Sequence, residues 1–102
     1  MTYPLILRPE AEEDLLTAYR WYDDQVPGLG LRFVESVERA LGKIEQNPQQ
    51  YATVYEGVRR ARISTFPYGI YYSFEDERTV VLAVAHSSRH PRVWLERVRR
   101  AP

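Results

Sequence analysis

The side chains best suited to chemistry lie near the end of the chain, directly after its longest apolar run. Residues 80–85 are all apolar and lead into His86, and Arg89 follows three residues later. A histidine can act as a general acid or base near neutral pH, and an arginine can stabilise negative charge that develops on a phosphate. The pair therefore permits cleavage of RNA. It permits binding without catalysis equally well, because a histidine at a strand end can also simply hold a turn in place.

Three arginines form a second candidate site. Arg59, Arg60 and Arg62 lie in a β-prone run, where alternation places Arg60 and Arg62 on one face of the strand and Arg59 on the other. Guanidinium groups that share a face can hold phosphate or carboxylate in a bidentate manner. Arginine on an exposed strand also discourages edge-to-edge aggregation, so the cluster fits a binding role or a structural one.

Aromatic side chains gather on two predicted elements and are candidates for contacts with a partner. Tyr19, Trp21 and Tyr22 belong to a predicted helix, and Tyr71 belongs to a β-prone run rich in tyrosine. Such rings are enriched at protein–protein hot spots, and rings interleaved with arginine can also stack on bases. Most of them are expected to pack partly in the core. Trp21 lies off the apolar stripe of its helix, so we expect it to be exposed at an interface.

Composition limits the class of protein. The chain has 102 residues, of which 44% are apolar and 27% charged, as expected for one soluble domain over residues 1–102. No segment approaches the ~20 apolar residues of a membrane span, and the N-terminus does not resemble a signal peptide, so we expect a cytoplasmic protein with no membrane partner. There is no cysteine, and the two histidines lack a carboxylate at ligand spacing, so neither a metal nor another cofactor is expected.

The charges balance overall but are unevenly distributed along the chain. Residues 1–57 carry 10 acidic and 5 basic side chains, and residues 58–102 carry 4 acidic and 9 basic ones. The two segments therefore have formal charges of −5 and +5. This asymmetry predicts a basic face that could meet phosphate or an acidic partner chain, although acidic helices and basic strands could give the same pattern by chance.

Helical periodicity is confined to the first half of the chain. A short strand over residues 3–8 precedes a helix that begins at Pro9, where proline and the acidic residues after it suit a helix N-terminus. A second helix begins near Leu29, after a turn at Pro27, and ends before Pro48. Two helices joined by a short turn are expected to form an antiparallel hairpin.

The second half of the chain has the alternation of β-strands. A loop through Tyr51 and Tyr55 leads to three β-prone runs, over residues 58–66, 68–74 and 78–86. Short connections make these runs an antiparallel meander, and residues 91–99 are expected to form a short terminal helix or tail. The predicted fold is α+β, in the order β-α-α-β-β-β, with the helical hairpin on a small, mainly antiparallel four-stranded sheet. Because residues 80–85 are apolar on both faces, their strand needs cover from both sides.

The order of elements and several short motifs resemble a known family. Over essentially its whole length, the chain is similar to the RelE/ParE superfamily of toxins from type II toxin–antitoxin operons, in particular to the ParE-like, plasmid-stabilisation branch. The residues that carry the resemblance are Ala11-Glu12-Glu13-Asp14-Leu15, Trp21-Tyr22, Gly28-Leu29-Gly30 with Phe33, Ile44 ahead of Pro48, Val58-Arg59-Arg60, Phe66-Pro67-Tyr68 with Ile70-Tyr71-Tyr72, and His86-x-x-Arg89-x-Pro91-x-x-Trp94.

The resemblance implies a small cytoplasmic toxin that a cognate antitoxin neutralises in a hetero-oligomeric complex. ParE-type toxins inhibit DNA gyrase by binding, whereas RelE-type toxins cut mRNA on the ribosome. Gly69 stands at the middle-strand position where RelE-type toxins carry an arginine, and Trp94 stands where a reactive tyrosine is found. We therefore favour gyrase inhibition. A ribosome-dependent endoribonuclease is the first alternative, and a non-toxic module that only binds an antitoxin is the second.

Site residues follow from these hypotheses. The predicted contacts with the target are Arg59, Arg60, Arg62, His86, Arg89 and Trp94. If the protein is instead a nuclease, the candidate catalytic residues are His86, Arg60, Arg62 and Arg89. The predicted antitoxin contacts are Tyr19, Trp21, Tyr22, Tyr71 and Val81, because a segment that folds on binding could cover the apolar last strand.

Overall fold

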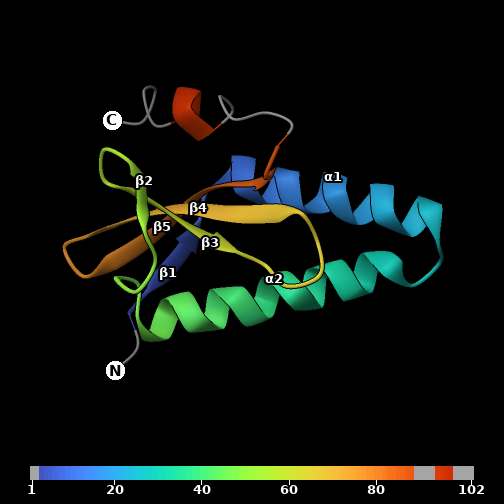
Figure 1. The fold of residues 1–102 in the computed structure, drawn as a ribbon, viewed down its shortest axis with the longest axis horizontal. Coiled ribbons are helices and arrows are strands. Elements are labelled where there is room, and N and C mark those ends of the chain that lie inside the picture. Colours follow the sequence, from blue (N-terminus) through green and yellow to red (C-terminus); the bar gives the residue numbers. More distant parts are fainter. Residues whose placement is uncertain (1–2, 89–93, 98–102) are drawn as a thin grey trace.

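Two helices lie against one face of a five-stranded sheet (Figure 1). The structure is a computed structural model that describes residues 3–88 and 94–97. Residues 94–97 are helical, as part of the predicted terminal helix. The preceding elements are β1 (Leu5–Leu7), α1 (Pro9–Gln25), α2 (Leu29–Gln46), β2 (Thr53–Tyr55), β3 (Val58–Arg62), β4 (Tyr68–Glu75) and β5 (Arg78–His86).

The helical hairpin forms where the sequence predicts it, and its turn is fixed by a carboxylate. Gly28 adopts a φ of 91°, which favours glycine. Its N–H donates to Oδ1 of Asp23 over 2.9 Å, and the N–H of Gly30 donates to the same oxygen over 3.3 Å. Gly30 also allows the two helices to approach closely, because a Cβ there would lie 2.6 Å from the carbonyl oxygen of Tyr19.

The sheet has the strand order β1-β5-β4-β3-β2, in which β1 runs parallel to β5 and the other pairs are antiparallel. The predicted α+β class and order of elements are confirmed, but the sheet has five strands rather than four. The additional strand, β2, lies in the segment predicted to be a loop. Its three residues are too few to show alternation, and they form a strand because they pair with β3 across a turn at Gly57, whose φ is 68°.

The sheet is buried on both faces. On the helix side, Val81 and Val84 of β5 pack with the apolar stripe of α2, of which Phe33 is fully buried. On the opposite face, Ala83 and Ala85 form a smaller cluster. The chain itself contributes to the cover that β5 was predicted to need there, because Trp94 packs against this second cluster.

The segment after α2 is anchored to the sheet by Tyr72. The hydroxyl of Tyr72 donates to the carbonyl oxygen of Pro48 over 2.5 Å, and the tyrosine is fully buried. Burial raises the pKa of this phenol to about 12, partly offset by the nearby guanidinium of Arg59. The group therefore remains a neutral hydrogen-bond donor across the physiological pH range.

We predict that Gly30→Ala lowers the free energy of unfolding by about 1–3 kcal/mol, because its methyl group would overlap Tyr19 and force the helices apart. Gly42→Ala is the matched control on the same helix. A Cβ at Gly42 meets nothing within 4 Å, so this variant should gain about 0.5–1 kcal/mol from helix propensity alone. Urea unfolding of both variants tests the prediction, and equal effects of the two would contradict it.

Candidate functional site

Arg60 and Arg62 share the sheet face opposite the helices. Alternation along β3 puts them on the same side as Val58, which belongs to the second cluster, whereas Ala61 points to the helices. Arg60 pairs across the sheet with Tyr71, and Arg62 pairs with Gly69. The two arginines therefore share a face, as strand alternation predicts, and the structure places them beside Tyr71.

Gly69 provides the space in which the Arg60 side chain lies. A Cβ at Gly69 would be only 3.2 Å from Cγ and 3.3 Å from Cδ of Arg60, so the aliphatic stem of the arginine lies directly over the glycine backbone. A larger residue at this position would displace Arg60. Gly69 thus provides the space that positions Arg60 on the neighbouring strand.

Arg59 lies on the helix side and binds the backbone of the chain itself. Its Nη1 donates to the carbonyl oxygens of Gln49, over 3.1 Å, and Tyr51, over 2.6 Å. These bonds hold the segment between α2 and β2 against the sheet. Of the three β3 arginines predicted to contact the target, Arg59 has an evident structural role, and its contact with a target stays a prediction.

His86 ends β5 on the helix side of the sheet, away from Arg60 and Arg62. It pairs with Tyr68, which packs against the core under the helices, and the two rings meet edge to face with centroids 5.3 Å apart. Its Nδ1 accepts a hydrogen bond of 3.2 Å from the N–H of Ser88, which helps to shape the turn after the strand. Because the sheet separates His86 from Arg60 and Arg62, these three of the residues predicted for RNA cleavage do not converge on one face.

Trp94 and Arg89 complete the predicted target contacts. The indole of Trp94 stacks on Tyr71 with ring centroids 5.1 Å apart and an interplanar angle of 10°, and it meets the ring of Tyr55 edge to face. Trp94 is thus part of the aromatic cluster next to Arg60. Arg89 lies outside the described residues, so its role stays a prediction.

The predicted antitoxin contacts differ widely in exposure. Trp21 is 48% exposed, as expected from its position off the apolar stripe, and Tyr19 is half-buried beside Gly30. Tyr22 packs among the rings of the main core, 5.3 Å from Phe33. Tyr71 and Val81 are buried and offer almost no surface in this conformation. Among these predicted contacts, Trp21 therefore exposes the largest fraction of its surface.

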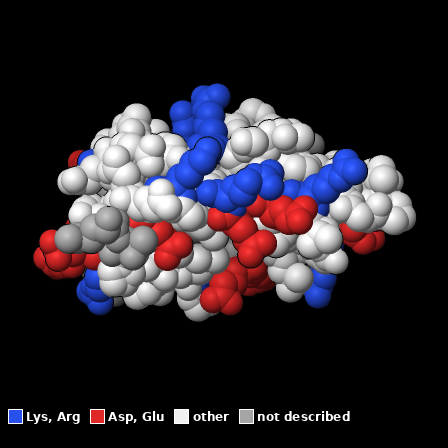
Figure 2. Space-filling model, turned by 90° about the horizontal axis from the view of Figure 1, so that it is seen from below, with Lys and Arg blue, Asp and Glu red and all other residues white. Residues whose placement is uncertain are grey.

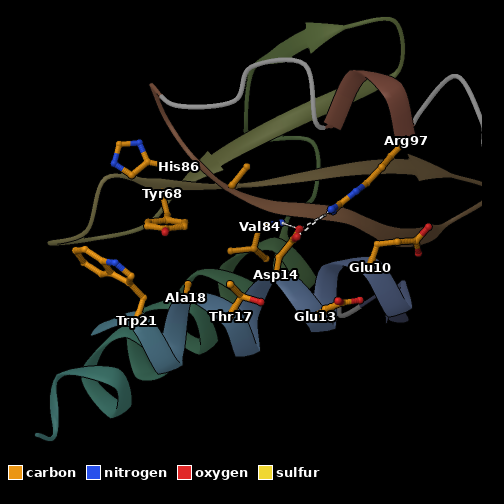
Figure 3. Close-up of a pocket in the computed structure, with 11 residues that line it drawn as sticks. Glu10, Glu13, Asp14, Thr17, Ala18, Trp21, Tyr68, Val84, His86 and Arg97 are labelled. Atoms are coloured by element: carbon orange, nitrogen blue, oxygen red, sulfur yellow. Dashed lines mark hydrogen bonds and ion pairs between the residues drawn. The ribbon is translucent and has the colours of Figure 1, made fainter. Parts of the chain in front are cut away.

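A groove of about 440 Å³ runs between α1 and the end of β5, and Trp21 and His86 lie at one end of it (Figure 3). Its central feature is a contact that the sequence analysis did not identify. The carboxylate of Asp14 receives two hydrogen bonds from the guanidinium of Arg97, Nη1 to Oδ2 over 2.5 Å and Nη2 to Oδ1 over 2.9 Å. The hydrogen bonds to Asp14 raise the pKa of the Arg97 guanidinium above its ordinary value.

Asp14 and Arg97 also satisfy polar groups along the edge of β5. Strand β1 pairs with β5 only at Thr79–Val81, which leaves the following residues without a neighbouring strand on that side. Oδ2 of Asp14 accepts the N–H of Val84 over 3.0 Å, and Nη1 of Arg97 donates to the carbonyl oxygen of Leu82 over 3.2 Å. The ion pair therefore takes the place of a strand partner and ties residues 94–97 to α1.

Charges of both signs occur on the surface of α2. Figure 2, seen from below onto this helix, shows a band of Lys and Arg with Asp and Glu directly beside it. The exposed charged residues of the helix include Arg32, Glu35, Glu38, Arg39 and Lys43. The uneven charge of the two sequence segments therefore does not make this face uniformly acidic. No helix in the described part of the chain is long and apolar enough to cross a membrane.

Comparison with known proteins identifies the family. A family model described as the ParE toxin of type II toxin–antitoxin systems, parDE, matches residues 5–91. Toxin ParE2 from two Mycobacterium tuberculosis strains is 30% identical to the chain over 95 residues, which covers 89% of this chain and 88% of the relative. The chain belongs to the ParE toxin family.

Solved structures show the fold that this ParE-family chain shares with other toxins. One, from the chromosomal ParDE toxin–antitoxin system of P. aeruginosa, has a TM-score of 0.75 at 19% identity and covers 83% of this chain and 96% of its own. A free-state mutant of the E. coli toxin RelE has a TM-score of 0.67 at 18% identity and covers both chains completely. The toxin–antitoxin complex RelBE2 from Mycobacterium tuberculosis has a TM-score of 0.58 at 23% identity, over 84% of this chain and 99% of its own. The predicted membership of the RelE/ParE superfamily is confirmed.

We predict that Asp14→Ala lowers the free energy of unfolding by about 2–3 kcal/mol, because it leaves the N–H of Val84 and the guanidinium of Arg97 without their acceptor. Glu12→Ala, an exposed acidic residue on the same helix, should change stability by about 0.5 kcal/mol or less. Thermal and urea unfolding measure both. Equal effects of the two substitutions would show that the ion pair does not stabilise the fold.

Proposed function

We propose that this ParE-family toxin inhibits DNA gyrase by binding it, and that a cognate antitoxin neutralises the toxin in a hetero-oligomeric complex. The observation that carries the proposal is the separation of Arg60 and Arg62 from His86 by the sheet. Because the described candidate for a general acid or base, His86, lies on the other face, the arginine pair is suited to binding a target and not to cutting a phosphodiester. Family membership supports the same function.

The proposed contact surface with gyrase consists of Arg60, Arg62 and Trp94. Arg62 is exposed at the end of β3, and Arg60 and Trp94 are half-buried beside Tyr71. Arginine next to a rigid aromatic ring is typical of protein–protein hot spots, because the guanidinium contributes charge and the ring contributes contact area at low entropic cost. An acidic surface or DNA phosphate held by gyrase would complement this patch.

An antitoxin partner is supported by the surface of α1 and by the relatives. Trp21 and Leu16 are 48% and 45% exposed, so α1 presents two large apolar side chains that a partner could cover. One of the similar solved structures is a toxin–antitoxin complex, and another comes from a ParDE system. We propose that the antitoxin covers α1 and that both proteins act in the cytoplasm, with a role in plasmid stabilisation.

The proposal predicts that Arg60→Ala combined with Arg62→Ala weakens inhibition of gyrase supercoiling by about tenfold or more, because each arginine at a hot spot contributes about 1 kcal/mol or more. Arg20→Ala combined with Arg39→Ala removes two exposed arginines from the helices and serves as the charge-matched control. The control should inhibit gyrase like the unsubstituted toxin. Undiminished inhibition by the Arg60 and Arg62 variant would show that this surface does not bind gyrase.

A further inference from the structure

The groove between α1 and β5 has two chemically different ends (Figure 3). Trp21 and His86 lie together at one end with Tyr68 between them. Glu10 and Glu13 lie at the other end, on the first turns of α1, below the side chain of Arg97. One end can therefore hold an apolar or aromatic group, and the other end can hold a cation.

The acidic end carries more negative charge than its own arginine neutralises. Three carboxylates line the groove, those of Glu10, Glu13 and Asp14, whereas Arg97 is its only lining guanidinium, so two negative charges remain among these described residues. Arg97 pairs with Asp14 and feels the field of the other two carboxylates. Glu10 and Glu13 are exposed and form no ion pair with another described residue. The described carboxylates of the groove thus favour a second cation.

The contact of Arg97 with Asp14 shows that this end of the groove binds a guanidinium in a bidentate manner. A basic side chain from a partner would meet similar carboxylates next to a site that already binds one arginine. At the other end, an indole that is 48% exposed beside a cavity is the kind of aromatic surface that anchors a partner in a protein interface. The two ends therefore favour a single occupant that carries an apolar group and a cation.

The dimensions of the groove favour an extended peptide. Glu13 and Trp21 are eight residues apart on α1, which corresponds to about 12 Å along the helix axis. An extended chain crosses this distance in about four residues. The opposite wall of the groove is the end of β5, where Asp14 and Arg97 already bond the strand edge at Val84 and Leu82, so an extended segment lies over the ion pair and does not join the sheet.

We propose that this groove binds an extended basic segment of a partner protein. The segment places a large apolar side chain against Trp21 and, about four residues away, a Lys or Arg facing Glu10 and Glu13. This site is separate from the Arg60 and Arg62 surface proposed to bind gyrase. Its charge is also opposite to that surface, so the two sites select different partners or different parts of one partner.

A displayed library of random seven-residue peptides, selected on the intact chain, tests the proposal. Selected peptides should carry Lys or Arg about three to five positions from Trp, Phe or Leu. A selected peptide is then labelled and titrated by fluorescence anisotropy. Glu10→Gln combined with Glu13→Gln should weaken its binding about fivefold at low salt, because two partly exposed charge pairs are lost. Trp21→Ala should weaken binding about tenfold.

Glu12→Gln combined with Glu38→Gln removes two exposed carboxylates that do not line the groove and should leave affinity unchanged. Circular dichroism of all variants confirms that they are folded. Selection of peptides without basic residues, failure to select any peptide, or equal weakening by the two glutamine pairs would each overturn the proposal. The Arg60 and Arg62 variant of the gyrase assay changes no residue of this groove, so the gyrase proposal and this one are tested separately, whereas Trp21 is shared with the α1 surface proposed for the antitoxin.

Discussion

Burial of β5 on both faces is the constraint on which the rest of this structure depends. A strand whose Val81 and Val84 face one way and whose Ala83 and Ala85 face the other must be covered twice. The helical hairpin covers one face, and Trp94 contributes to the cover of the other. The edge of β5 beyond β1 is completed by the Asp14 and Arg97 ion pair, so backbone groups there remain hydrogen-bonded.

This arrangement divides the polar residues of the protein between two surfaces. Arg60 and Arg62 emerge on the face that carries Trp94, and His86 emerges beside α1. A nuclease centre would need the base and the cationic clamp within reach of the same phosphate. The sheet places them on opposite sides, and this separation is the physical reason for favouring a toxin that binds its target.

The sequence was sufficient to predict the elements that have a long, regular pattern of apolar residues. The stripe of α2 and the alternation of β3 predict their positions and the faces that they bury, including the shared face of Arg60 and Arg62. Strand β2 was missed because three residues cannot display a period, and it exists only through its pairing with β3. The Asp14 and Arg97 pair was also missed, because 83 residues separate its members and Asp14 alone looks like a helix N-terminal charge.

The sidedness of His86 depends on a local irregularity that the sequence does not reveal. The register between β4 and β5 shifts between Tyr71 and Tyr72, which changes the alternation of β5 near Leu82. As a result, the face on which His86 lies could not be predicted by counting alternate residues from the start of the strand. The binding partner of the chain could not be predicted from the fold either, since a shared fold does not determine which protein or nucleic acid a surface binds.

Pulse-labelling of bacteria after tightly controlled induction of the chain tests the central claim most directly. Incorporation of labelled thymidine and labelled methionine is followed in the same culture, with the unsubstituted chain and with His86→Gln. Inhibition of gyrase by binding predicts that DNA synthesis falls first while translation continues, and that His86→Gln is as toxic as the original chain. A collapse of translation before DNA synthesis, abolished by His86→Gln, would contradict the account and establish a nuclease instead.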